Sequence, residues 1–253
     1  MKLKRAHQQV AELLLDAETV VAFTGAGIST ESSIPDFRSP GGIWDRFDPD
    51  DFTIERFYQD PKKYWEKRLE LHRAFRFEEA QPNPAHHAVA DLERMGKLNM
   101  VITQNIDGLH QAAGNSEARV IELHGNVREV KCMVCEARYP RESVWEEVER
   151  GDLPPRCERC GGVMKLATVS FGELLPADAL RRAEQAARTC DLFMVVGSSL
   201  GVEPAASLPR NAKWHGAKLM IINLEPTPLD RVADIVIHEK AGACLTEILS
   251  RLT

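Results

Sequence analysis

The chain has 253 residues, 43% of them hydrophobic and 28% charged, and a formal net charge of −6. This length suffices for one large α/β domain that carries a smaller inserted module. The negative charge argues against a broad basic surface, so we expect no strong direct nucleic-acid binding. The apolar cluster Leu13–Leu15, between Glu12 and Asp16, is too short for a signal peptide or a membrane span. We therefore expect no membrane association, and four of six cysteines in CxxC pairs favour a reduced, cytoplasmic setting over disulfides.

The first predicted elements are a helix and a strand. Residues 3–16 place Val10 and Leu14 on one apolar face, which predicts an amphipathic helix. The apolar run Thr19–Phe23 then predicts a buried strand. Further along, Asn83 followed by proline is a favoured helix start, and this helix is expected to end at Gly96.

The rest of the chain alternates short apolar runs with helical stretches. Helices are predicted over 176–189 and 242–252. The apolar runs predict strands at Leu98–Thr103, Val120–Leu123, Leu192–Val196, Leu219–Ile222 and Ile235–Ile237. Such alternation implies the α/β class, with a Rossmann-like parallel sheet and helices on both faces.

Two segments interrupt this pattern. Residues 31–82 are rich in aromatic and charged side chains and contain no clear strand, and residues 126–170 contain two cysteine pairs. We interpret both as insertions that form a small second domain. The predicted dinucleotide-binding domain then comprises residues 1–30, 83–125 and 171–253.

The turn after the first strand contains Gly25, Ala26, Gly27 and, further on, Thr30. A strand followed by a glycine turn presents backbone N–H groups to a pyrophosphate, so this turn predicts dinucleotide binding. The third glycine of the usual G-x-G-x-x-G fingerprint is Thr30 here. The chain therefore departs from the ordinary dehydrogenase pattern just after the turn.

Ligand-type residues also follow four later strands, at the end where open α/β sheets bind ligands. They are Gln104, Asn105, Ile106 and Asp107; His124; Gly197, Ser198 and Ser199; and Asn223, Leu224 and Glu225. Glycine and hydroxyl groups suit phosphate or ribose oxygens, and a carboxylate suits a ribose diol. Each group also has a simpler explanation. Asn105 or Asp107 could cap a helix, His124 could be a surface or core residue, and the residues after Val196 and Ile222 could serve only to form turns. Because five strand ends share the pattern, a nucleotide site is favoured.

Two CxxC pairs form the strongest metal signal of the sequence. Four thiolates at this spacing converge on one tetrahedral Zn²⁺, and a filled ligand shell leaves no position for water, which indicates a structural site. The alternative is reduced cysteines without metal. The predicted ligands are Cys132, Cys135, Cys157 and Cys160, whereas Cys190 and Cys244 are expected to be small buried apolar residues.

These motifs, together with Ile34–Arg38 and Phe171–Glu173, resemble in identity and order those of the sirtuins of the prokaryotic type, which are NAD-dependent protein-lysine deacylases. The resemblance extends from about residue 18 to the C-terminus. It implies that NAD binds between a Rossmann domain and a small zinc-containing domain and is consumed. An acetyl-lysine protein or peptide would yield free lysine, nicotinamide and O-acetyl-ADP-ribose.

The resemblance also implies roles for individual residues. His124 would be the general base that activates a ribose hydroxyl. The nicotinamide pocket would be lined by Asn105 and Asp107, with Gln104 and Ile106 beside them. A cofactor loop would carry Ala26, Phe37 and Arg38, with Phe37 shielding the reactive ribose from water. The adenosine side would be held by Ser198, Ser199, Asn223 and Ala243. An extended peptide would pair as an added strand with a surface formed by Phe171, Gly172, Glu173, Val202 and Glu203.

Some positions depart from the family pattern. Ser33 stands where the family usually has glycine, which predicts a stiffer loop, and Leu166 and Ala167 stand where a proline is common. Glu203 places an acid near the peptide groove, which predicts a preference for basic residues beside the target lysine. The Tyr-x-x-Arg pair of succinyl-preferring members is replaced by Arg68 and Leu71, so we expect neutral acyl groups, acetyl first.

Three other functions compete with deacylation. Mono-ADP-ribosyl transfer uses the same NAD pocket and differs in the fate of the acceptor. A non-enzymatic zinc module would not need Asn105, Asp107 and His124. An ordinary NAD dehydrogenase is disfavoured by the broken fingerprint.

Overall fold

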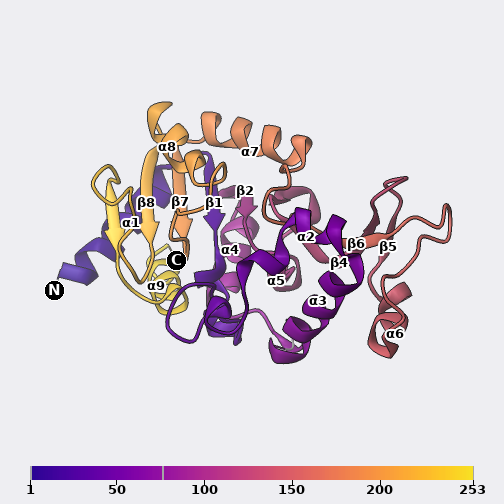
Figure 1. Cartoon of the computed structure of the whole chain (residues 1–253). Coiled ribbons are helices and arrows are strands. Elements are labelled where there is room, and N and C mark those ends of the chain that lie inside the picture. Colours follow the sequence, from indigo (N-terminus) through magenta and orange to yellow (C-terminus); the bar gives the residue numbers. More distant parts are fainter. Residues whose placement is uncertain (1, 76, 253) are drawn as a thin grey trace.

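The computed structural model describes residues 2–75 and 77–252, and its centre is a six-stranded parallel sheet (Figure 1). The strand order is β3-β2-β1-β7-β8-β9. The bounds are β1 (Val20–Thr24), β2 (Leu98–Thr103), β3 (Val120–Glu122), β7 (Leu192–Val196), β8 (Lys218–Ile222) and β9 (Ile235–Ile237). Each strand begins and ends within one residue of its predicted bounds. The predicted α/β class is therefore confirmed.

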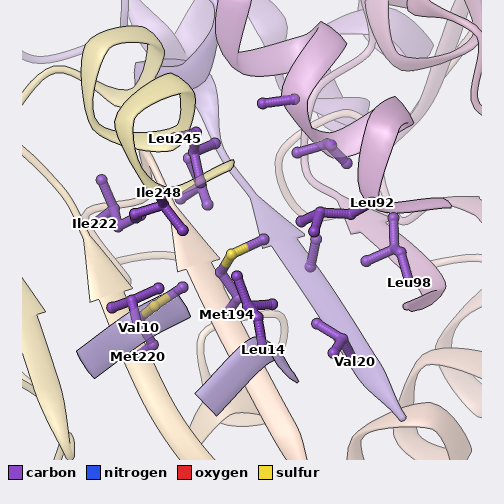
Figure 2. Close-up of a cluster of buried hydrophobic side chains, with 14 of the residues drawn as sticks. Val10, Leu14, Val20, Leu92, Leu98, Met194, Met220, Ile222, Leu245 and Ile248 are labelled. Atoms are coloured by element: carbon purple, nitrogen blue, oxygen red, sulfur yellow. The ribbon is translucent and has the colours of Figure 1, made fainter. Parts of the chain in front are cut away.

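Helices cover both faces of this sheet. One face is covered by α1 (Lys2–Asp16), α4 (Pro84–Arg94) and α9 (Ala241–Leu249), and the other by α7 (Ala177–Thr189) and α8 (Ser207–Trp214). Figure 2 shows Leu14 and Ile248, from two of the helices, beside Met194 and Met220 of the sheet. Fully burying an apolar side chain of this size contributes roughly 1.5–3 kcal/mol, so these faces fix how the helices pack.

Helix α4 begins where the sequence predicts. The side chain of Asn83 accepts a hydrogen bond from the Ala85 amide at 2.9 Å, and the backbone N–H of Asn83 donates to Nδ1 of His86 at 3.3 Å. The Asn83 amide group also donates to the Ile28 carbonyl at 2.7 Å and to Ser32 Oγ at 2.9 Å. One capping residue thus ties the start of α4 to the loop that follows β1.

Two helices differ from the predicted pattern. Helix α8 is not among the helices predicted from the sequence. Its Pro209 lies in the first turn, where the missing N–H has no helical partner to lose. Helix α9 ends at Leu249, three residues before the predicted end at 252. None of the described helices is long and apolar enough to cross a membrane.

A second, antiparallel sheet lies beside α2 and α3 at the far end of the molecule from α1 (Figure 1). It contains β4 (Gly125–Cys132), β5 (Arg138–Pro140) and β6 (Met164–Thr168) in the order β5-β4-β6. Its neighbours are α2 (Ile54–Gln59), α3 (Pro61–Phe75) and α6 (Glu142–Arg150). Phe57 and Trp65 share a buried cluster with Val130 and Met164, so the two predicted insertions do pack together. The exact domain bounds stay a prediction.

Short helices complete the chain. Helix α5 (Leu109–Ala113) follows β2. Single 3₁₀ turns occupy Ala26–Ile28, Thr30–Ser32, Ile43–Asp45, Pro49–Phe52, Phe77–Glu79 and Glu117–Arg119. The two turns directly after β1 stand where an ordinary dinucleotide fold would begin a helix, as the missing third glycine suggests.

Candidate active site and metal centre

The loops that leave β1, β2 and β7 meet at the carboxyl edge of the parallel sheet. The backbone N–H of Gln104 donates to the Thr24 carbonyl at 2.9 Å, and that of Gly27 donates to the Gly197 carbonyl at 2.8 Å. The amide of Gln104 also donates to Ser198 Oγ at 2.8 Å. Sheet register therefore brings these predicted cofactor residues together.

Three glycines make the close approach of these loops possible. A Cβ on Gly25 or on Gly27 would lie 2.8 Å from the Gly197 carbonyl oxygen. A Cβ on Gly197, whose φ is +62°, would lie 2.2 Å from the Ile28 nitrogen. These glycines are required by loop-on-loop packing, which is a structural reason for them beside the predicted approach to a pyrophosphate. Thr30 Oγ1 closes the turn by donating to the Gly27 carbonyl at 3.0 Å.

A buried polar cluster lies next to the glycine turn. The Asn105 amide donates to the Gly25 carbonyl and to Ser29 Oγ, both at 3.1 Å, and Ser29 Oγ donates to Asp107 Oδ2 at 2.8 Å. Burial raises the pKa of Asp107, and hydrogen bonds from the Leu109 backbone and Ser29 oppose that shift. Asp107 Oδ1 accepts the bond from the Leu109 backbone at 3.0 Å, next to the start of α5, but the N-cap residue of that helix is Gly108.

Ser29 is a site residue that the sequence analysis did not single out. Its side chain is 1% exposed and joins Asn105 to Asp107. The signal was present, because this hydroxyl follows the glycine turn by two residues. Ile106, which the sequence places between Asn105 and Asp107, uses its carbonyl to accept a bond from the Val127 backbone.

The ring of His124 is held in one tautomer by its surroundings. Its Nδ1 lies 2.9 Å from the Gln104 carbonyl oxygen, which can only accept, so Nδ1 carries the proton and Nε2 keeps its lone pair. Burial lowers the pKa of His124 from its usual 6.5, and the bond to Gln104 opposes that shift. Gly125 beside it has φ +70°, and a Cβ there would lie 1.9 Å from the Ala167 carbonyl. The geometry suits a neutral imidazole that accepts a proton at Nε2.

The predicted cofactor loop lies against the predicted peptide segment. The rings of Phe37 and Trp44 are 5.1 Å apart, and Trp44 is 5.9 Å from Phe171. Phe37 is 37% exposed, which leaves its ring accessible at the surface. Arg38 is exposed, and its backbone N–H is bonded to Asp36.

The predicted adenosine residues are less tightly held. Ser198 is buried, whereas Ser199, Leu224, Glu225 and Ala243 are exposed. The Asn223 amide donates to the Glu225 carbonyl at 2.7 Å. Next to Ala243, the Gly242 backbone N–H at the start of α9 donates to Glu31 at 2.9 Å.

The predicted peptide residues have backbone partners of their own. The N–H of Phe171 donates to the Phe52 carbonyl at 3.3 Å, and its carbonyl accepts from Ile54 at 2.9 Å. Gly172 has φ +78°. On the other segment, Val202 is half-buried, and exposed Glu203 lies 3.8 Å from Arg210. The N–H of Glu173 donates to the Ser170 carbonyl at 3.0 Å, so the N–H groups of Phe171 and Glu173 both have partners within the chain.

The four cysteines of the antiparallel sheet region form one cluster. Their sulfur atoms lie within 4.8 Å of one another, with Cys132 and Cys160 at 3.6 Å and Cys135 and Cys157 at 3.7 Å. Tetrahedral coordination at a Zn–S distance of about 2.3 Å places sulfurs about 3.8 Å apart. The donor set and its spacing fit a structural zinc ion, as predicted. Cys190 and Cys244 are buried elsewhere, and burial raises the pKa of each to about 12.

The parallel sheet with polar groups at its carboxyl edge, next to a four-cysteine centre, defines a nucleotide-binding α/β protein with a structural metal module. The Sir2 family model matches residues 25–204, and the chain belongs to this family, the sirtuins.

Relatives and solved structures agree with this assignment. An NAD-dependent protein deacetylase of Caldivirga maquilingensis is 47% identical, over 97% of this chain and 93% of its own length. An NAD-dependent protein deacylase 2 of Archaeoglobus fulgidus is 46% identical, over 97% and 95%. A Sir2 structure with a p53 peptide and NAD⁺ superimposes with a TM-score of 0.86 at 40% identity, over 96% of this chain and 97% of that one.

Proposed function

We propose that this protein is an NAD-dependent protein-lysine deacetylase that uses NAD as a consumed co-substrate. The observation that carries the proposal is the hydrogen-bonded group at the carboxyl edge of the sheet, where the half-buried His124 keeps a free Nε2 lone pair. The Sir2 family membership and the curated names of close relatives support the same reaction. A structural zinc ion held by the four clustered cysteines completes the enzyme.

His124 is the proposed general base. Bound NAD supplies the ribose whose hydroxyl is to be activated and the carbon that receives the acyl oxygen. Since Nδ1 donates to the Gln104 carbonyl, Nε2 accepts the hydroxyl proton, and the Gln104 carbonyl then stabilises the charged ring. Burial keeps the imidazole neutral near pH 7, because it lowers the pKa of His124.

Asn105 and Asp107 form the proposed nicotinamide pocket, with Ser29 as the hydroxyl that orients both. Asn105 is fixed from two sides, so it meets a ligand with little loss of side-chain freedom. Phe37 on the exposed loop is proposed to cover the ribose after nicotinamide leaves, which limits hydrolysis. The glycine turn and Ser198 are proposed to hold the phosphates and adenosine.

The proposed substrate is an acetyl-lysine segment in an extended conformation. Sir2 structures with acetylated or p53 peptides support a peptide substrate for the family. Gly172 and Glu173 on one side and Val202 and Glu203 on the other are the proposed pairing edges. We propose that the enzyme prefers to remove neutral acyl groups from lysine, so acetyl should be removed faster than succinyl.

One experiment tests this function. The purified protein is incubated with an acetyl-lysine peptide, with and without NAD, and the peptide mass is followed for the wild type, His124→Ala and the exposed control His215→Ala. We expect NAD-dependent loss of the acetyl group, reduced roughly 10²–10⁴-fold in His124→Ala only. A peptide that gains ADP-ribose instead would favour mono-ADP-ribosyl transfer, and a fully active His124→Ala variant would contradict the proposed base.

A further inference from the structure

Lys165 on β6 is almost completely buried, with 2% of its side chain exposed, and no step above uses it. Its ammonium lies 3.1 Å from Glu173 Oε2 and 3.3 Å from both the Leu166 carbonyl and Ser170 Oγ, and it also donates to the Thr168 carbonyl. An ammonium group has three protons to donate, so these acceptors occupy all of them. Every acceptor belongs to residues 166–173, which comprise the end of β6 and the segment that leads from it to the proposed peptide edge.

Stability alone does not account for a lysine at this position. Removing an ammonium from water costs several kcal/mol, and a buried ion pair is often no more stable than apolar residues of similar size. What the charge supplies is a single preferred arrangement of its acceptors. Here it draws two carbonyls of β6, together with the hydroxyl of Ser170 and the carboxylate of Glu173, toward one point.

The segment that this ammonium organises contacts both halves of the proposed site. The backbone N–H of Val169 donates to the carbonyl of His124 at 2.8 Å. Ser170 Oγ is 3.0 Å from the hydroxyl of Tyr64 on α3, and the Ser170 N–H donates to Glu173 at 2.9 Å. The turn at 170–173 is therefore fixed from β6, from α3 and from within.

We propose that Lys165 is a positioning residue for the acyl-lysine peptide. Its ammonium holds the turn Ser170–Glu173 in the shape in which Gly172 and Glu173 present their backbone to the substrate. Through Val169 the same segment supports the backbone of His124. The inference rests on the proposed deacetylase function, because only that function gives the turn a peptide to bind.

The test uses a double-mutant cycle in the full-length, zinc-loaded enzyme. The variants are Lys165→Met, Glu173→Gln and the double variant. Lys131→Met is the matched control, since Lys131 is the cross-strand neighbour of Lys165 on β4 and pairs with exposed Glu136. We measure KM for an acetyl-lysine peptide, KM for NAD, and hydrogen exchange of residues 168–173 without substrate.

We expect Lys165→Met to raise the peptide KM roughly ten- to a hundredfold while the NAD KM stays within about twofold. The double variant should be no worse than Lys165→Met alone, because the two side chains act as one unit. Exchange at 168–173 should be faster in Lys165→Met, and Lys131→Met should match the wild type. If Lys165→Met does not fold, Glu173→Gln must by itself raise the peptide KM while leaving the NAD KM unchanged.

Three results would overturn the inference: an unchanged peptide KM, a parallel rise in both KM values, and unchanged exchange at 168–173. A wild-type enzyme that fails to remove acyl groups would instead overturn the proposed function. In that case the exchange measurement, which needs no substrate, still decides whether Lys165 orders the turn.

Discussion

The carboxyl edge of the parallel sheet and the four-cysteine region are held together by different forces. At the sheet edge, loops lock through backbone groups, with Gly27 bonded to Gly197 and Gln104 bonded to Thr24. In the four-cysteine region, the sulfur atoms of Cys132 and Cys160 lie 3.6 Å apart, and those of Cys135 and Cys157 lie 3.7 Å apart. Thiolates at that separation repel one another unless a cation lies between them.

This difference shows how each region sets the position of its functional groups. The sheet edge derives its geometry from strand register and from glycines that admit close contact, so the chain alone is sufficient. The four-cysteine region derives its geometry from a bound metal, whose binding energy becomes folding energy. Changes that remove one support should therefore leave the other region intact.

Removing zinc should produce the largest effect. Structural zinc contributes roughly 10–16 kcal/mol to small metal domains at neutral pH, so a chelator or Cys157→Ser should unfold β4–β6. Activity should be lost with it, because β6 leads into the turn at 170–173. We expect hydrogen exchange to become fast in β4–β6 while β1, β2 and β7 stay protected. Cys190→Ala, which removes a buried cysteine outside the cluster, should keep its metal. Equal loss of protection in both sheets would contradict the separation.

Gly197→Ala should destabilise the carboxyl edge of the parallel sheet without loss of the zinc ion. The new Cβ would lie 2.2 Å from the Ile28 nitrogen at a φ of +62°, so both backbone strain and overlap are added. We expect unfolding to become easier by roughly 2–4 kcal/mol and NAD binding to weaken, with an unchanged metal content. Gly216→Ala is the control, because its φ is +98° and no atom lies within 4 Å of its Cβ. If denaturant unfolding shows the same loss of stability in Gly197→Ala and Gly216→Ala, then the packing of the loops around Gly197 does not contribute to stability.

Much of the sheet edge could be predicted from the sequence. The strands are apolar runs such as Leu192–Val196 that end at glycine or polar residues, and parallel pairing brings those ends together. The metal site of the four cysteines could equally be predicted, since CxxC spacing fixes the ligand geometry. Local sequence was sufficient in both cases because the signal lies within a few residues.

The remaining features depend on contacts between distant residues. Strand β4 mixes charged and polar residues with apolar ones, and its Lys131 lies opposite Lys165 of β6, so the hydrophobic alternation in this sheet is weak. The role of Ser29 appears only when Asn105 and Asp107 are brought beside it. The pairing of Phe171 with Phe52 and Ile54 likewise joins two segments more than 100 residues apart, which no local pattern reveals.

Acid should weaken the sheet-edge region gradually as the pH falls. Burial lowers the pKa of His110 from 6.5 to about 4, and its Nε2 lies 2.8 Å from Thr24 Oγ1 at the end of β1. Since the folded-state pKa lies below the unfolded value, the unfolded chain binds the proton first, and stability falls as pH drops from about 6.5 to about 4. Each such histidine contributes about 1.4 kcal/mol per pH unit in this window. Urea unfolding at several pH values gives the free energy of unfolding as a function of pH. This free energy should fall less steeply with acid in His110→Gln than in the wild type, and it should fall as in the wild type in the exposed control His215→Gln.

Ser33→Gly should have the smallest effect and complements Gly197→Ala. Ser33 has φ 64° and ψ 16°, a left-handed conformation that costs a residue with a Cβ roughly 1 kcal/mol. Glycine removes that strain but gives the unfolded chain more freedom, worth about 0.4–1 kcal/mol, so the two contributions nearly cancel. We expect the free energy of unfolding to change by less than about 0.5 kcal/mol. Amide exchange should become faster over residues 34–42, because the serine limits the motion of this loop. If exchange stays the same there, the serine does not stiffen the loop that carries Phe37 and Arg38.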